Sequence, residues 1–482
     1  MGENLTYWDG YYTCKILPMK SGMGNDSLKT KTKKMKSILK LLLICGVISM
    51  VGCGDFLEEK PQKSLVIPNS LDDFQAILDA EPRFMNSLGS FALIGSDDMV
   101  MTPNLLSIVP PQMQAVYLWE EEVFTQLESV DDWNIPYQMI YNANVVLEGL
   151  SEYELKNESD RIRSMELEGS AKFSRAFGHF SLMQLFSPPF SSAEPSQPGI
   201  PIRVSADINV ATGLSTASEV YELILSDLEF ARENLPDKPE LLTRPSAWAS
   251  ESLLSRVYMV LQNYKKAFEH ADAALKIGNS LMDYNTLSKG NGYVFPRFNP
   301  EVIFHVNVIS TRLTSNSGLL VNPDLYRLYD SLDQRKELLF EEATHEGFYN
   351  LISRYSGDFY DFSGLAVDEV LLNHAEAAAR LGMESIALED LNRLMKNRIR
   401  AGYFKEQYFT GAALMKRILE ERRKELLFRG IRWMDLRRLN QENAYAVTLE
   451  REYNEGNAML EPNGKGYTIP IPPLESQLNP SL

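Results

Sequence analysis

The residue with the most specific chemistry in this sequence is Cys53, the last residue of the segment Ser-Met-Val-Gly-Cys. Residues 39–51 are mostly apolar, and several lysines lie upstream of them. An apolar run of about a dozen residues is too short to span a membrane, which takes roughly 20 helical residues, but it suits a cleaved signal. A small residue followed by cysteine is what the peptidase that cleaves lipoprotein signals requires. The pattern therefore predicts a signal peptide over 35–52 and a lipid on the Cys53 thiol.

The other two cysteines support this interpretation. Residues 1–34 precede Met35, which would begin a well-proportioned signal, so we expect them to be a mis-assigned start or an extension, or else a long basic region of the signal itself. Cys14 lies in that extension and Cys45 in the apolar run. Cleavage before Cys53 would leave one thiol, and lipid would occupy it. The mature chain is then expected to hold no disulfide, thiolate metal site or cysteine nucleophile.

Motifs of catalysis and cofactor binding are missing from the sequence. The five histidines form no His-Glu-x-x-His pair, and there is no Gly-x-Ser-x-Gly, Walker or Gly-x-Gly-x-x-Gly pattern, so we expect no metal and no cofactor. Acidic neighbours could supply glycosidase carboxylates. They are Asp97 with Asp98, Asp131 with Asp132, and residues 120–122. Such pairs arise by chance in a chain with 65 acidic residues, and we expect most of them to cap helices or face solvent. The formal net charge of −17 also disfavours nucleic acid as a partner.

Any functional site must be positioned by the surrounding secondary structure, and most of the chain shows apolar residues at helical spacing. Ser70 is expected to cap a helix that buries Leu71, Phe74 and Leu78. Further helices are expected along the stripe from Trp133 through Tyr137, Ile140, Tyr141 and Asn144 to Leu147, along Phe173–Leu185, and over Tyr221–Leu235, Ser246–Leu261, Tyr264–Leu275, Val370–Leu381 and Ser385–Arg398. The sequence therefore predicts a mainly α fold.

Two of these helix pairs resemble tetratricopeptide repeats. In the first pair, Tyr264 is followed by Ala267, Ala271 and Ala274, and such small residues let two helices approach closely. The second pair is broken at Gly382. The spacing between the pairs is irregular, so we expect a tetratricopeptide-like frame rather than a regular solenoid.

Residues 280–365 have a different character, because they are rich in glycine, proline and aromatic residues and show only one clear strand, Val302–Val308. Irregular insertions on a rigid frame are where binding surfaces tend to lie. We therefore expect a loop-rich insertion here.

Seven segments in order carry a resemblance to a known family. They are the lipoprotein signal, Asp-Asp-Trp-Asn-Ile-Pro-Tyr from Asp131, Glu-Gly-x-Ala-x-Phe-x-Arg-Ala from Glu168, Tyr-x-x-Ile-x-x-Asp-Leu from Tyr221, the repeat over 244–275, and Glu-Glu-Arg-Arg-Lys-Glu-Leu-Leu-Phe-Arg-Gly-Ile-Arg-Trp from Glu420, followed by a terminal Ile-Pro-Ile-Pro-Pro from Ile469. The chain resembles the SusD/RagB family of outer-membrane nutrient-binding lipoproteins over 53–482. Ser170 and Arg429 depart from the family, which usually has glutamate at both positions.

The resemblance implies one SusD-like nutrient-binding unit over 53–482, with an N-terminal part over 53–235 and a C-terminal part over 236–482. It implies a non-catalytic, lipid-anchored protein at the outer-membrane surface, which binds a glycan or peptide and delivers it to a SusC-like TonB-dependent barrel. The alternatives are a surface glycosidase that uses paired carboxylates and a repeat scaffold that binds only proteins.

Sugar capture uses flat aromatic faces together with a few polar groups. We expect Trp133, Trp248 and Trp433 to be structural. The ligand-binding candidates are Trp119, Tyr293, Tyr349 and Tyr360.

Overall fold

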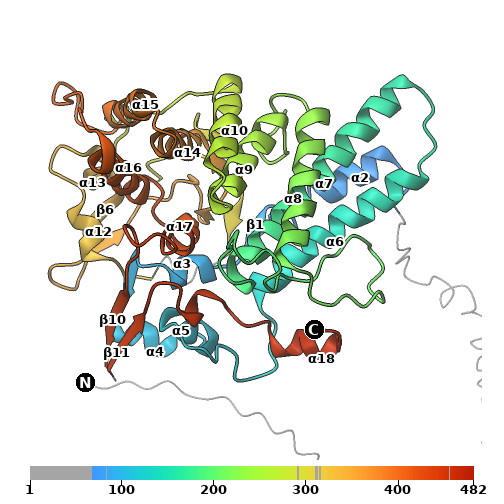
Figure 1. The fold of residues 1–482 in the computed structure, drawn as a ribbon, viewed down its shortest axis with the longest axis horizontal. Coiled ribbons are helices and arrows are strands. Elements are labelled where there is room, and N and C mark those ends of the chain that lie inside the picture. Colours follow the sequence, from blue (N-terminus) through green and yellow to red (C-terminus); the bar gives the residue numbers. More distant parts are fainter. Residues whose placement is uncertain (1–67, 83, 290–292, 310–312, 314–315, 455) are drawn as a thin grey trace, which may run out of the picture. The chain divides into compact units, whose positions relative to one another are not determined.

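Helices packed side by side form the frame of the structure, a computed structural model that describes residues 68–482 except 83, 290–292, 310–312, 314–315 and 455 (Figure 1). The α-helices are α2 (Leu71–Leu78), α3 (Phe91–Gly95), α4 (Pro103–Ile108), α5 (Pro111–Tyr117), α6 (Asp131–Glu152), α7 (Glu158–Phe186), α8 (Ala217–Asn234), α9 (Ala247–Val260), α10 (Tyr264–Ile277), α12 (Pro323–Arg327), α13 (Gln334–Leu339), α14 (Val367–Arg380), α15 (Glu384–Lys396), α16 (Gly411–Glu425), α17 (Ile431–Leu439) and α18 (Pro473–Leu478). The prediction of a mainly α fold is confirmed. The predicted signal peptide and Cys53 lie outside the described residues.

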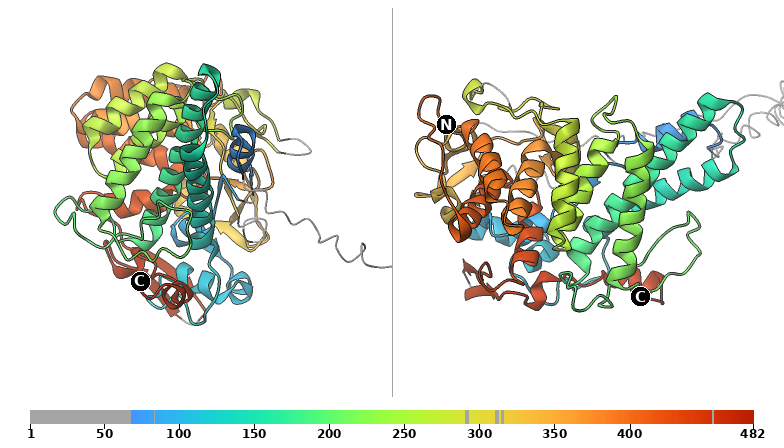
Figure 2. Two further views of the ribbon diagram at one scale, coloured as in Figure 1. Left: turned by 90° about the vertical axis from the view of Figure 1, so that its right-hand side faces the viewer. Right: turned by 45° about the horizontal axis from the view of Figure 1, so that its top comes forward.

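The long helices follow one another in space in the order of the chain. Helix α6 packs on α7, α7 on α8, α8 on α9, α9 on α10, α10 on α14, and α14 on both α15 and α16. Figure 2 shows this succession of neighbouring helices from a second direction. Each helix buries a face against its chain neighbours, as expected for tetratricopeptide-like units.

Local sequence signals explain where these helices begin and end. The Ser70 side chain accepts from the Asp73 amide, and the Asp73 side chain accepts in return from the Ser70 amide, so α2 begins with the predicted cap. At the start of α10 the Asn263 side chain accepts from the Lys266 amide. Gly382, at φ +78°, lies in the turn between α14 and α15, where a residue with a side chain would be strained.

Small residues make the contact between the repeat helices close. The three alanines of α10, Ala267, Ala271 and Ala274, are each fully buried. Helix α10 packs on both α9 and α14, so its small face is covered from two sides. The predicted helix pairs over 246–275 and 370–398 are therefore confirmed as packed units.

The strands are short, and the sequence revealed few of them. They are β1 (Ser87–Leu88), β2 (Met99–Met101), β3 (Val302–Phe304), β4 (Asn307–Val308), β5 (Leu319–Val321), β6 (Phe340–Glu342), β7 (Tyr349–Leu351), β8 (Asp361–Phe362), β9 (Leu365–Ala366), β10 (Leu449–Tyr453) and β11 (Gly456–Leu460). The predicted strand at 302–308 is present as β3 and β4. The neighbouring strands β5 to β9 were missed, because two or three residues are too few to show an alternating pattern.

The short strands join distant parts of the chain. Strand β4 pairs with β1 in parallel, with Ser87 opposite Asn307, and with β8 on its other side. Strand β2 pairs with β5 and β3 with β9, both antiparallel. Strands β6 and β7, and strands β10 and β11, form hairpins. The insertion is thus held to the N-terminal region by strand pairing.

The arginine-rich segment from Glu420 to Arg438 forms the end of α16 and most of α17, and several of its charges are buried in pairs. The Arg422 guanidinium donates to the Asp435 carboxylate at 2.7 Å. Arg438 donates to both oxygens of Glu376 at 2.6 and 2.7 Å. A buried charge is tolerated only when a partner compensates it, so the order of charges in this motif is a packing requirement.

Arg429, one of the two departures from the family pattern, has its own partner. Its guanidinium donates to Asp368 at 3.0 and 2.7 Å and lies 3.5 Å from the centroid of the Tyr355 ring. The side chain is buried. The departure therefore leaves no uncompensated charge in the core.

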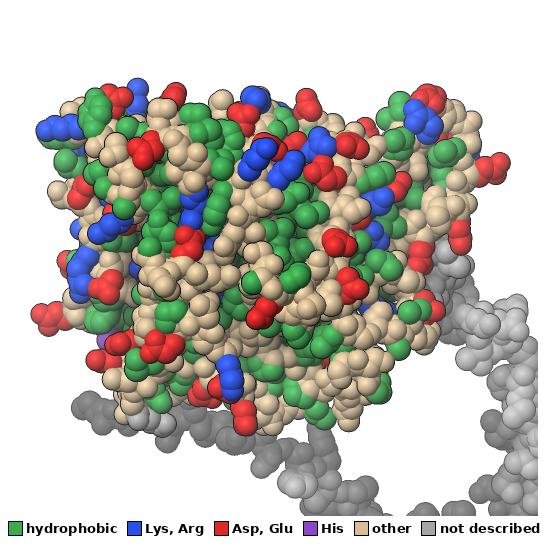
Figure 3. Space-filling view, viewed as in Figure 1, with side chains coloured by type: hydrophobic (Ala, Val, Ile, Leu, Met, Phe, Trp, Pro, Cys, Tyr) green, Lys and Arg blue, Asp and Glu red, His purple; other side chains and the backbone are tan. Residues whose placement is uncertain are grey.

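Acidic, basic and apolar side chains are intermixed on the face of the molecule that Figure 3 shows. In the part of the chain that the structure describes, no helix combines the length and the apolar character needed to cross a membrane.

Candidate functional site

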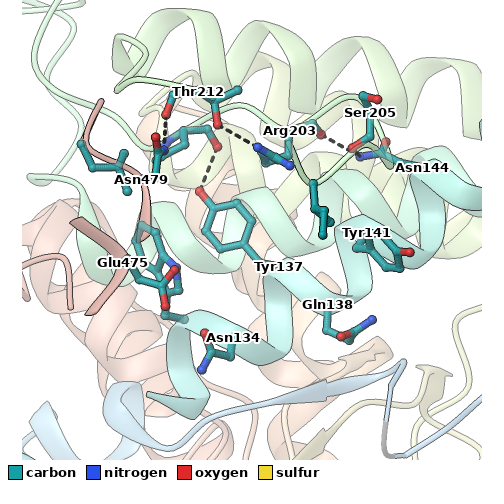
Figure 4. Close-up of a pocket in the computed structure, with 14 residues that line it drawn as sticks. Asn134, Tyr137, Gln138, Tyr141, Asn144, Arg203, Ser205, Thr212, Glu475 and Asn479 are labelled. Atoms are coloured by element: carbon teal, nitrogen blue, oxygen red, sulfur yellow. Dashed lines mark hydrogen bonds between the residues drawn. The ribbon is translucent and has the colours of Figure 1, made fainter. Parts of the chain in front are cut away.

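An open groove of about 460 Å³ lies between α6, the segment 201–212 and the C-terminal helix α18 (Figure 4). This volume falls in the range of small-molecule sites. The residues that line it are Trp133, Asn134, Tyr137, Gln138, Tyr141, Asn144, Pro201, Arg203, Ser205, Ile208, Thr212, Glu475, Asn479 and Leu482. The groove thus combines aromatic rings with amide, hydroxyl and charged groups.

The floor of the groove is the aromatic face of α6. Trp133, Tyr137 and Tyr141 are spaced by four residues, so they lie on one side of the helix. The Trp133 and Tyr137 ring centroids are 4.8 Å apart, and Trp133 also meets Phe186 edge to face at 4.9 Å. Trp133 is buried, Tyr137 half-buried and Tyr141 40% exposed. Aromatic surface therefore becomes more accessible from the first turn of α6 towards its middle.

The wall opposite α6 is held by one buried amide. Asn144 donates through Nδ2 to the carbonyls of Arg203 (3.1 Å) and Ser205 (3.3 Å). Its Oδ1 accepts from Arg175 of α7, which makes a two-point ion pair with Asp227 of α8 at 2.8 Å. Asn144 is fully buried. This chain of contacts ties the groove wall to three helices of the frame.

Further contacts close the ends of the wall. The Tyr137 hydroxyl donates to the Pro201 carbonyl at 2.8 Å. Arg203 donates to the Val210 carbonyl at 2.5 Å and to the Thr212 hydroxyl at 3.2 Å. Asn479 donates to the Thr212 carbonyl at 2.7 Å, which joins the segment after α18 to the same wall. These contacts therefore hold the segment 201–212 in place without a ligand.

One carboxylate and one guanidinium face this groove. Burial raises the pKa of the Glu475 carboxyl above its usual value, while a hydrogen bond from Trp133 acts in the opposite direction. The Arg203 guanidinium donates hydrogen bonds to Val210, Thr212 and Asp207 of the groove wall. The groove thus offers a carboxylate acceptor and several amides, which can bind hydroxyl groups, beside ring faces, which can stack on C–H surfaces.

The three predicted tyrosines lie outside the groove. Tyr293 is 49% exposed. Tyr349, in β7, stacks on Tyr326 with centroids 3.6 Å apart and an angle of 13° between the rings. Tyr360 is half-buried and meets Phe359 edge to face at 5.9 Å. Ligand binding by these three tyrosines stays a prediction.

The fourth candidate, Trp119, is packed into the protein interior, and a role for it in ligand binding stays a prediction. Its side chain is only 6% exposed. The indole N–H donates to the Gly95 carbonyl at 2.8 Å, and the Arg451 guanidinium lies 4.2 Å from the ring centroid. Both the polar edge and a face of the ring are therefore already occupied.

Trp133, Trp248 and Trp433 are buried, as predicted for structural tryptophans. Tyr137, Tyr141 and Asn144 belong to the stripe that the spacing identified, but their position at a groove was not foreseen. A polar asparagine inside an otherwise apolar stripe was the one available signal, because a buried amide must have partners.

Two of the acidic residues considered for a glycosidase, Asp97 and Asp132, have structural partners. Asp97 makes a two-point ion pair with Arg432 at 2.6 and 2.9 Å. Burial raises the pKa of Asp132 to about 7, while amide donors from Ser90 and Phe91 act in the opposite direction. The cavity beside Asp132 has a volume of about 50 Å³, too small for a sugar ring. A pKa suited to acid catalysis is therefore present without room for a substrate.

Among the described residues, one group of three carboxylates could approach a single cation: Glu301, Asp368 and Glu425. Arginines already neutralise them. Arg398 bonds Glu301 at 2.8 Å and Glu425 at 2.7 Å, and Arg429 bonds Asp368. A divalent cation would have to displace these guanidinium groups, so the donor set fits an ion-pair network better than a metal site.

Comparison with known families gives two matches along the chain. Residues 55–259 match the family described as "Starch-binding associating with outer membrane", and residues 367–482 match the SusD family. SusD-like protein P2 of Formosa agariphila is 25% identical over an alignment of 529 positions, which covers 92% of this chain and 98% of that protein. SusD-like protein P25 of the same organism is 25% identical over 247 positions, 48% of this chain and 44% of that protein.

Solved structures share the fold. A putative sugar binding protein from Bacteroides vulgatus has a TM-score of 0.69 at 22% identity, covering 86% of this chain and 97% of that one. A SusD superfamily protein from Bacteroides thetaiotaomicron has the same score and identity, covering 86% and 98%. A laminarin binding SusD-like protein has a TM-score of 0.55 at 19% identity, covering 75% and 89%. Because the two family matches together cover more than half of the residues, this chain belongs to the SusD family.

Proposed function

We propose that this protein is a non-catalytic, cell-surface glycan-binding lipoprotein that delivers oligosaccharides to a SusC-like TonB-dependent outer-membrane transporter. The observation that carries the proposal is the groove along α6. There the rings of Tyr137 and Tyr141 lie beside Asn134, Gln138 and Glu475. Family membership, and the sugar-binding and laminarin-binding descriptions of structural neighbours, support a glycan over a peptide as the ligand.

The chemistry of the groove matches a sugar. A hexose presents a C–H surface that packs on an aromatic ring, and hydroxyl groups around its edge that need donors and acceptors. Tyr141 supplies the most exposed ring of the floor, and Gln138 and Glu475 supply polar groups around it. The wall is built from backbone held by Asn144, so little of it has to become ordered when ligand binds.

The binding test compares the wild type with Tyr141→Ala, using laminarin and soluble starch as probes in calorimetry. An aromatic contact of about 1–2 kcal/mol predicts a loss of affinity of roughly 5- to 30-fold. Tyr408→Ala is the matched control, because Tyr408 is 80% exposed and lies outside the groove. If Tyr141→Ala binds as tightly as the wild type, the groove is not the site. Hydrolysis of either glucan would favour an enzyme instead.

Cell-surface attachment and delivery are tested separately. Cys53→Ala should yield a folded protein that binds glycan in solution but no longer supports uptake, because lipid anchoring requires the thiol. The wild type should co-purify with a large β-barrel transporter. Unchanged uptake by the Cys53→Ala strain, or a solitary protein after gentle extraction, would contradict the membrane-tethered role.

A further inference from the structure

Three turns outside the groove converge on Arg297. Its guanidinium lies 3.4 Å from the Glu81 carboxylate and 3.4 Å from the Asp358 carboxylate. The turn that carries Asp358 fits closely against the Arg297 backbone, since a Cβ on Gly357 would lie 2.3 Å from the Arg297 nitrogen. Gly357 also has φ +65°, so this turn requires glycine. The close contact between the Asp358 turn and the Arg297 turn therefore depends on glycine at position 357.

Each of these three turns exposes a phenylalanine. Phe84 is 44%, Phe298 39% and Phe359 49% exposed. The Arg297 guanidinium lies 4.6 Å from the centroid of the Phe298 ring, which places a cation beside an accessible aromatic face. We call the set Glu81, Phe84, Arg297, Phe298, Asp358 and Phe359 the Arg297 platform.

The backbone at Phe298 distinguishes this ring from ordinary surface aromatics. Its φ is +56°, a conformation that costs a bulky residue about 1–3 kcal/mol. Trp119 and Phe428 have φ near the same value, but both rings are buried, and burial offsets the strain. Phe298 keeps a large part of its ring in solvent. Strain held at an exposed side chain is a feature of functional sites.

The polar groups of the platform have hydrogen-bonding capacity that their contacts within the protein do not fill. Arg297 has five N–H donors, and the two ion-pair distances of 3.4 Å are long for hydrogen bonds. The Arg297 side chain is 43% exposed and that of Asp358 30%. Donors and acceptors therefore remain available beside the aromatic rings. Two carboxylates against one guanidinium also make the surface unfavourable for an anionic ligand.

We propose that the Arg297 platform is a second glycan-contact site, which takes neutral glucose units of a polymer whose other units occupy the α6 groove. This inference rests on the proposed function. The two surfaces border the same helix, because Asn142 of α6, the residue after Tyr141, donates to the Phe84 carbonyl at 3.3 Å. A chain that contacts both sites binds more tightly than a short oligosaccharide that can fill only one.

The test uses the double variant Phe298→Asn with Phe359→Ala. Asparagine tolerates positive φ, so the first change removes the ring and relieves backbone strain. That relief offsets the lost ring contacts with Arg297 and His305, so thermal unfolding should stay close to that of the wild type. Affinity is measured for polymeric laminarin, for a laminarin hexasaccharide and for alginate, an anionic polymer. The double variant should bind polymeric laminarin about tenfold more weakly and the hexasaccharide as the wild type does. Alginate should not bind.

Parallel measurements on Tyr141→Ala separate the two proposals. That variant should weaken both the polymer and the hexasaccharide. If the double variant binds the polymer normally while Tyr141→Ala does not, the platform is refuted and the groove stands. If the double variant loses all binding and Tyr141→Ala loses none, the groove proposal fails instead. A wild type that binds no laminarin, or a double variant that loses only co-purification with the transporter, overturns the platform as a glycan site.

Discussion

Replacing Asn144 by aspartate tests whether one buried amide holds the wall of the groove. The substitution keeps the shape of the side chain and preserves an oxygen for Arg175. It changes the two donors that face the carbonyls of Arg203 and Ser205 into an acceptor. A carboxylate oxygen would then lie about 3 Å from two carbonyl oxygens in a site closed to water.

The expected cost follows from these contacts. Losing two hydrogen bonds removes about 1 kcal/mol each, and leaving buried acceptors without donors adds about 1–3 kcal/mol. The charge of Arg175 is already balanced by Asp227, so it would compensate only part of the new negative charge. We expect Asn144→Asp to lower the free energy of unfolding by about 3–4 kcal/mol at pH 7. We also expect the released wall to weaken laminarin binding by about tenfold.

The pH dependence provides an internal check. Protonation of the new carboxyl restores one O–H donor towards a carbonyl, so the folded state should bind this proton more tightly than the unfolded state does. Stability relative to the wild type should therefore fall as the pH rises from 5 to 8. Urea denaturation across this range measures the effect, and calorimetry measures binding.

Asn134→Asp is the matched control for this variant. Asn134 lies on the same helix, is half-buried and has the Ser129 hydroxyl as its partner at 2.7 Å. The control should change the free energy of unfolding by less than about 0.5 kcal/mol. An Asn144→Asp protein as stable as this control would show that the wall does not depend on the amide.

Two further predictions concern the buried ion pairs of the C-terminal half. Burial alone would raise the pKa of Glu376, but Arg438 and Arg380 outweigh it and lower that pKa to about 2. The lowered pKa corresponds to about 3 kcal/mol of folding stability. This stabilisation should be complete above pH 4.5, the ordinary pKa of a glutamate, and should be lost as the pH falls towards 2. In urea denaturation, Glu376→Gln should therefore be less stable than the wild type at pH 7 and nearly as stable as the wild type near pH 2. Arg429→Glu should destabilise the fold by more than about 4 kcal/mol, because it places a second carboxylate against Asp368, whereas Arg429→Lys should cost less. A soluble Arg429→Glu protein with wild-type thermal unfolding would contradict the pairing.

Much of the helical frame could be predicted from sequence, because its signals are local. The cap at Ser70, the alanine face after Tyr264 and the glycine break at 382 each act within one or two turns of helix. The family resemblance could be recognised for the same reason, since its motifs are contiguous. The strands β5 to β9 could not be predicted, because each is only two or three residues long, and the partners of β5, β8 and β9 lie far away in the sequence.

The sequence alone was enough to predict a signal peptide over 35–52 that places Cys53 first in the mature chain, a mainly α frame and a resemblance to the SusD family. Which aromatic rings are accessible, in contrast, depends on the tertiary structure. Spacing placed Trp133 and Tyr141 on one helix face, and both line the groove, yet the first is buried and the second is 40% exposed. Trp119 looked available and is buried against Arg451. Exposure depends on side chains that come from remote segments, and only folding brings those segments together.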